Sequence, residues 1–136
     1  MLKMTISILF VIHGFITMAQ SSGLFTGSLG IANPGWIRWW PVNLGQSWLL
    51  AKLGLESRPI LALTGVLWLA AGIGFLGTGL SLAGWIIPHG VWSGLAGGSA
   101  LVSLVVLALF FHPLYVAAVI LNVGIYLTVL RGMVAA

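Results

Sequence analysis

The chain has 136 residues, of which 60% are hydrophobic and 4% are charged, and its net charge is +4. A soluble domain carries about 25% charged residues because its surface faces water, so this composition predicts an integral membrane protein. Cys and Asp are absent and Glu56 is the one acidic residue, which excludes disulfides, thiolate chemistry, carboxylate pairs and a Ser–His–Asp triad. The sequence therefore disfavours an enzyme and assigns no catalytic residue or metal ligand. The basic residues form no run, so we expect no nucleic-acid partner.

Residues 4–20 predict the first transmembrane helix, since a helix of about 20 apolar residues crosses a bilayer. A secretory signal peptide is the alternative, with Lys3 in its basic region and Thr17 to Ala19 as its cleavage site. The pair His13 and Gly14 is unusual in the apolar core of a signal peptide. We therefore favour a retained helix.

Residues 21–58 predict a long interfacial loop between the first two spans. Its first part is rich in Gly and Ser, which is typical of irregular structure. A Trp side chain favours the membrane–water interface, because its ring is apolar and its N–H needs a polar partner. We expect four such anchors, namely Trp36, Trp39, Trp40 and Trp48. Ser47 is expected to cap a short interfacial helix, and a plain loop is the alternative.

Three further spans are predicted at residues 60–80, 85–111 and 114–130, because no charged residue occurs between Pro59 and Leu130. Together with the first span they predict an all-α fold, an integral membrane four-helix bundle in a single transmembrane domain. Four spans place both termini on one side of the membrane. The basic residues are nearly balanced between the two sides, so the positive-inside rule predicts no orientation.

Small residues predict where helices approach each other closely. The third span contains three glycines spaced by four, Gly90, Gly94 and Gly98, and this spacing allows a second backbone to come near. The second span is also rich in small residues, namely Gly65, Ala71, Gly72, Gly74 and Gly77. We expect both sets to pack helices.

Four polar side chains are expected at similar depths in one half of the bilayer, given a helical rise of about 1.5 Å per residue. They are His13, His89, Asn122 and Tyr126, and Trp92 lies three residues after His89. Such groups are costly in hydrocarbon unless they find partners. We favour hydrogen bonds that fix helix packing. The alternative is a ligand-binding pocket for a quinone, a lipid headgroup or a haem.

Haem b held by two axial histidines is the weakest of these alternatives. His13 and His89 are the only pair at compatible depths, and depth is the only support for it. His112 is expected at the opposite end of the bundle and cannot pair with either. A proton pump or ion-coupled carrier is also disfavoured, because such proteins usually need carboxylates inside the membrane.

The order of the spans and a few positions resemble the DoxX-like family of small four-helix membrane proteins of bacteria and archaea. The resemblance rests on His13-Gly14-Phe15-Ile16 in the first helix, on the turn from Phe110 to Pro113, and on Asn122 in the last helix. Related sequences often carry a second histidine four residues after the first, where this chain has Thr17. The resemblance implies a prokaryotic plasma membrane. It also implies a link to quinone, since the family's namesake is similar to a membrane partner in quinone-linked thiosulfate oxidation.

Three functions remain open. We favour a non-catalytic or accessory subunit of a larger membrane assembly, bound to lipids and to other subunits or further copies of itself. The second function is a quinone- or lipid-binding redox partner that uses the His/Asn/Tyr pocket. The third is a small-solute transporter or channel built as an oligomer. A cavity that reaches the polar residues from the lipid side would favour binding, whereas a close-packed cluster would favour the scaffold.

Overall fold

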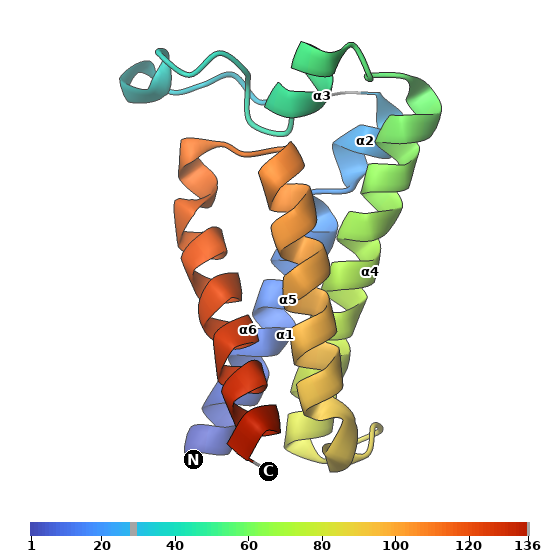
Figure 1. Ribbon diagram of the computed structural model, residues 1–136, viewed down its shortest axis with the longest axis vertical. Coiled ribbons are helices and arrows are strands. Elements are labelled where there is room, and N and C mark those ends of the chain that lie inside the picture. Colours follow the sequence, from blue (N-terminus) through green and yellow to red (C-terminus); the bar gives the residue numbers. More distant parts are fainter. Residues whose placement is uncertain (28–29, 136) are drawn as a thin grey trace.

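The computed structural model describes residues 1–27 and 30–135, with side chains up to Gly132. The described residues are largely helical (Figure 1), which confirms the all-α bundle. An antiparallel bridge joins Ile31 and Leu44 in the loop. In chain order the elements are α1 Leu2–Ala19, α2 Ser22–Thr26, η1 Gly35–Ile37, α3 Trp48–Leu53, α4 Arg58–Ala83, η2 His89–Val91, α5 Trp92–Leu109, η3 Pro113–Tyr115 and α6 Val116–Ala135.

Within the described residues, four segments of 20 to 26 residues are long and apolar enough to cross a membrane. These segments are Leu2–Thr26, Arg58–Ala83, His89–Leu109 and Pro113–Gly132. Both chain termini lie at one end of the bundle and the long loop lies at the other (Figure 1), as expected for four spans. We refer to these as the terminal end and the loop end.

The start predicted for the third span is wrong, because α4 is longer than its apolar pattern indicates. It runs from Arg58 to Ala83 and ends at Gly84, whose φ of +73° is the left-handed conformation of a helix C-cap. Residues 85–88 then form an irregular turn, and Pro88 leads into the short 3-10 helix η2. The third span therefore begins at His89, four residues later than predicted.

Glycine brings α1 and α4 together most closely. A Cβ added to Gly14 would lie 2.7 Å from the carbonyl oxygen of Gly72, and one added to Gly72 would lie 2.7 Å from that of Gly14. Nearer the terminal end, the Ser7 hydroxyl donates to the carbonyl of Gly79, where an added Cβ would lie 2.7 Å from the carbonyl of Ser7. No real Cβ is found at such distances, so α1 and α4 are in backbone contact. The packing role predicted for small residues of the second span is confirmed here.

The glycines spaced by four in the third span do not bring another helix of this bundle close. A Cβ added to Gly90, Gly94 or Gly98 meets no atom within 4 Å in the part of the chain that the structure describes. On α5, Gly94 and Gly98 share the exposed face with Leu101 and Val105. The core-facing residues of α5 are instead Ala96, Gly97, Ser99, Ala100, Ser103, Val106 and Leu107.

The long loop is held on the loop end by specific contacts. Ser47 caps α3 as predicted, accepting a hydrogen bond from the Leu50 amide at 3.0 Å, and its hydroxyl donates to the carbonyl of Leu109 at 2.6 Å. The Trp48 indole N–H donates to the carbonyl of Ala108 at 2.9 Å. Trp40 packs its ring against Phe111, with ring centroids 5.5 Å apart.

The four predicted Trp anchors therefore divide into two pairs. Trp36 and Trp39 are each 70% exposed, as a membrane-facing or water-facing anchor must be. Trp40 and Trp48 are partly buried, because they fasten the loop to the end of α5 and to the turn that follows it. The second pair thus has a structural role that does not depend on a membrane surface.

Candidate functional site

Three helices supply a chain of hydrogen bonds in the interior of the bundle. The His13 ring nitrogen Nε2 on α1 lies 3.3 Å from the Asn122 side-chain oxygen on α6. The Asn122 side-chain nitrogen donates to the Ser103 hydroxyl oxygen on α5 at 3.0 Å. Asn122 is fully buried and Ser103 is 1% exposed. Asn122 therefore joins two side chains that lie far apart in the sequence.

One ring contact with α4 and one hydrogen bond within α1 hold His13 in place. The ring lies against Phe75 of α4, with centroids 4.6 Å apart, and this contact exists because Gly14 lets α1 approach α4. One turn later, the Thr17 hydroxyl donates to the carbonyl of His13 at 2.8 Å. Because the Asn122 oxygen accepts, Nε2 of His13 is the donor, and the second nitrogen, Nδ1, is left as an acceptor in the neutral ring.

A cavity of about 370 Å³ opens beside this chain of hydrogen bonds. We call it the polar cavity. Side chains of α1 and α6 form its sides, and α4 and α5 contribute Trp68, Ser103 and Leu107. Its polar lining residues are His13, Thr17, Gln20, Ser103 and Tyr115. The cluster is therefore not close-packed.

The polar cavity lies between two helices that do not pack closely. Among the described residues, the extensive helix contacts run from α1 to α4, from α4 to α5 and from α5 to α6, and α1 and α6 are not such a pair. His13 and Asn122 bridge the space between them. The space is consequently bordered by lipid-facing residues, such as Ile16, which is 57% exposed, and Leu121, which is 48% exposed.

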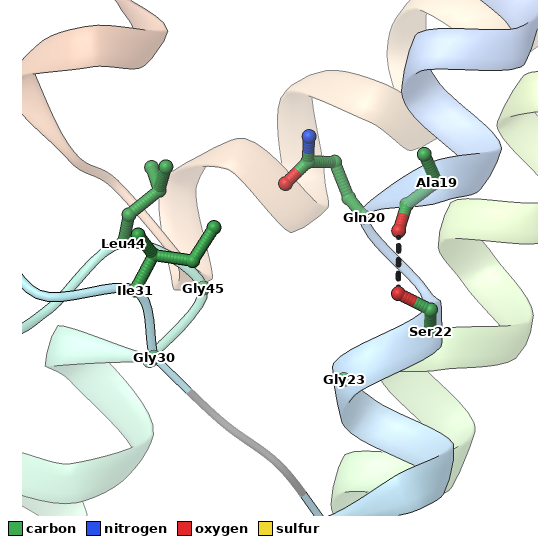
Figure 2. Close-up of a pocket in the computed structure, with 8 residues that line it drawn as sticks. All are labelled: Ala19, Gln20, Ser22, Gly23, Gly30, Ile31, Leu44 and Gly45. Atoms are coloured by element: carbon green, nitrogen blue, oxygen red, sulfur yellow. Dashed lines mark hydrogen bonds between the residues drawn. The ribbon is translucent and has the colours of Figure 1, made fainter.

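A hydrogen bond between Tyr115 and Gln20 closes the loop end of the polar cavity. The Tyr115 hydroxyl donates to the Gln20 side-chain oxygen at 2.7 Å. Beyond Gln20 lies a second cavity of about 330 Å³, between the end of α1 and the loop, with Ile31 and Leu44 on one side and Ala19 and Ser22 on the other (Figure 2). Gln20 lines both cavities. It therefore stands at the boundary between the membrane-spanning part and the loop.

The polar cavity offers both an acceptor and a donor for hydrogen bonds. No hydrogen bond of the described residues uses Nδ1 of His13. The Ser103 hydroxyl accepts from Asn122, and within the same residues its own hydrogen is not donated elsewhere. The site has no charged side chain in its lining. These groups suit a neutral ligand that carries a carbonyl or hydroxyl oxygen.

Three predicted site residues do not join His13 and Asn122. His89 is exposed in η2 at the start of the third span, because the helix begins later than expected. The pairing of His13 with His89 that a haem requires is therefore not formed. Tyr126 is partly buried and lines none of the cavities described in this section. Trp92 lines another cavity with Leu82 and Val129, and the lining of that cavity does not include His13 or Asn122.

Sequence reasoning missed most of the cavity's polar lining. Ser103 resembles the other small residues of the third span, so nothing in the sequence marks it as part of a site. Tyr115 lies near the predicted start of the last helix, where no repeating pattern indicates which way its side chain points. Gln20 follows the end of the first helix, where a polar side chain is ordinary, and it accepts a hydrogen bond from Tyr115. Thr17 did carry a signal, since it lies one turn from His13 on the same face.

Comparisons of the chain with protein-family models, with curated proteins and with solved structures found no match. The fold and the four spans define the class, which is an integral membrane protein with an all-α bundle.

Proposed function

We propose that this protein binds a quinone in the membrane, with the quinone head in the polar cavity. The observation that carries the proposal is the cavity itself, which places His13 and Ser103 beside a space of about 370 Å³. A quinone carbonyl accepts a hydrogen bond, as the Ser103 hydroxyl can supply. A quinol hydroxyl donates one, as Nδ1 of His13 can receive. One donor and one acceptor together can therefore bind both the oxidised and the reduced form of the ligand.

Several features support a quinone over a charged lipid. The lining has no Lys, Arg, Asp or Glu, so a phosphate or ammonium headgroup would find no counter-ion there. The aromatic rings of Trp68 and Tyr115 border the cavity, and a planar ring packs well against such faces. The resemblance to DoxX-like proteins points to quinone and to a prokaryotic plasma membrane, and we adopt both in the proposal.

The test is binding of a benzoquinone with a short tail, in its oxidised and reduced forms, to purified protein in nanodiscs. Ser103→Ala should weaken binding of the oxidised form about ten-fold, and His13→Leu should weaken binding of the reduced form by a similar factor, because each loses one buried hydrogen bond. His89→Leu is the matched control, since it removes an exposed histidine outside the polar cavity. If the unmodified protein binds neither form, or if all variants bind equally, the proposal is wrong.

A second candidate function is that of a non-catalytic accessory subunit of a larger membrane assembly. The observation that favours it is the exposed face of α5, where Gly94 and Gly98 find no partner within the described chain. Small residues on a lipid-facing surface allow another helix to approach closely. Native mass spectrometry of protein extracted from its own membranes tests this proposal. A stable complex with another subunit supports it, and a bare monomer contradicts it.

The cavities support the transporter hypothesis less than they support quinone binding. A solute path needs polar groups along its length. The cavities that continue from His13 toward the terminal end are lined mainly by Ile, Leu, Phe and Val.

A further inference from the structure

Two more cavities continue the polar cavity along the space between α1 and α6. The first, of about 220 Å³, is lined by Ile6, Leu9, Phe10, His13, Leu121 and Ile125. The second, of about 540 Å³, reaches Trp92, Gly124, Thr128 and Val129 near the terminal end. We call these two together the tail groove.

Neighbouring cavities share lining residues, so the three lie one after another along this space. His13 and Leu121 line both the polar cavity and the nearer part of the tail groove. Ile6, Phe10 and Ile125 line both parts of the tail groove. From Leu121 to Val129, nine residues of α6 extend along the groove, and the eight steps between them correspond to ~12 Å of helix.

The geometry points to an occupant with a long apolar tail: we infer that the tail of the quinone lies in the tail groove, with its head toward the loop end. This inference rests on the proposed function and deepens it. Polar lining is concentrated on one side of His13, whereas the other side is apolar apart from Thr128. An amphiphile with one polar end matches this division, because its head needs hydrogen bonds and its tail needs none.

Gly124 gives a direct way to fill the tail groove without disturbing the fold. It lines the groove on α6, and an added Cβ meets no atom within 4 Å among the described residues. In Gly124→Leu the new side chain would occupy space that the tail needs. Gly132→Leu is the matched control, because Gly132 is an exposed glycine on the same helix with an equally open environment and does not line the groove.

The experiment compares a short-tailed quinone with one that carries a long isoprenoid tail, for each protein in nanodiscs of one lipid composition. Partition of the long tail into the bilayer is then the same for every variant, so the ratio of the two dissociation constants isolates the groove. We expect Gly124→Leu to lower the preference for the long-tailed quinone about ten-fold, while Gly132→Leu and the short-tailed quinone remain unaffected.

The other outcomes overturn the inference in distinguishable ways. If Gly124→Leu keeps the preference of the wild type, the tail lies in the bilayer or a lipid acyl chain fills the groove, and the head site still stands. If Gly124→Leu weakens both quinones equally, the substitution acts on the whole fold and the groove holds no tail. If wild type binds neither quinone, the tail groove and the proposed function both fall.

Discussion

The two hydrogen bonds of His112 define which nitrogen of its neutral ring carries the hydrogen. Its Nδ1 accepts from the Leu114 amide at 3.2 Å, so Nε2 carries the hydrogen and donates to the Asn33 side-chain oxygen at 2.9 Å. The Asn33 side chain donates in turn to the carbonyl of Val42 at 2.9 Å. The neutral ring thus fastens the long loop to the turn between α5 and α6.

Acid should loosen this attachment. His112 is fully buried, and burial lowers its pKa from the ordinary value of 6.5. A group whose pKa is lower in the folded state takes up a proton more readily in the unfolded state, so stability is complete above pH 6.5 and decreases as pH falls below it. We expect the free energy of unfolding in detergent to decrease toward about pH 5, by at most ~1.4 kcal/mol per pH unit.

His112→Gln should remove this part of the pH dependence, because glutamine does not titrate. The other histidines, His13 and His89, are present in both proteins, so the difference between the two curves belongs to His112. Tyr115, whose ring centroid lies 6.2 Å from that of His112, is the titratable neighbour that the structure records in contact with it. Tyrosine titrates near pH 10 and does not contribute in this range. Identical curves would show that His112 is not the group responsible.

Residue type and depth predicted part of the site. His13 and Asn122 were predicted to converge because each is a polar group about halfway through an apolar span, and such groups need partners. Ser103 and Tyr115 were not predicted, because a serine in a small-residue helix and a tyrosine at a helix start have many ordinary roles. Only the packing of α5 and α6 brings them to the cavity.

At the level of helices, glycine acts differently on α1 and α5. A Cβ at Gly14 would meet the carbonyl of Gly72 at 2.7 Å, whereas one at Gly94 meets no atom within 4 Å in the described chain. Gly14→Ala should therefore force α1 and α4 apart and destabilise the bundle by ~1–3 kcal/mol. Gly94→Ala should be neutral or stabilise it by up to ~1 kcal/mol, because alanine favours a helix over glycine.

Unfolding of both variants in a denaturing detergent provides the comparison, with each helix content checked beforehand. Equal stability of Gly14→Ala and Gly94→Ala would contradict the close contact between α1 and α4. The sequence pointed the other way, since Gly14 is the one glycine of α1, whereas α5 carries glycines spaced by four. The pattern of small residues indicates that a helix can approach another, but it does not identify the partner.

Hydropathy predicted the existence of the spans better than their ends. Every predicted span corresponds to a helix that is long enough to cross a membrane. The boundary between α4 and α5 was misplaced, because Trp85 and Ile86 are apolar residues of the turn and are 65% and 86% exposed. Apolar side chains near an interface give no signal of where a helix stops.

For the whole molecule, the order of contacts explains why a groove exists. Because the helices pack in the order α1, α4, α5 and α6, the two outer helices are left without an extensive contact with each other in the described structure. Composition predicts four spans but not this order. The polar cavity and the tail groove both lie in the space that this order leaves between α1 and α6, so neither could be derived from the sequence alone.

The exposed glycines of α5, Gly94 and Gly98, line none of the three cavities between α1 and α6, so the proposed association and the proposed quinone binding can be tested separately. Gly94→Leu places a bulky side chain on the face shared by Gly98, Leu101 and Val105, where a partner helix would approach. If this face joins a larger assembly, the variant should lose the partner in native mass spectrometry while it binds a short-tailed quinone as before. Gly124→Leu should do the reverse, keeping the partner and losing the preference for a long tail. A complex that survives in Gly94→Leu would show that the partner binds elsewhere, because this side chain leaves no room for a close helix contact.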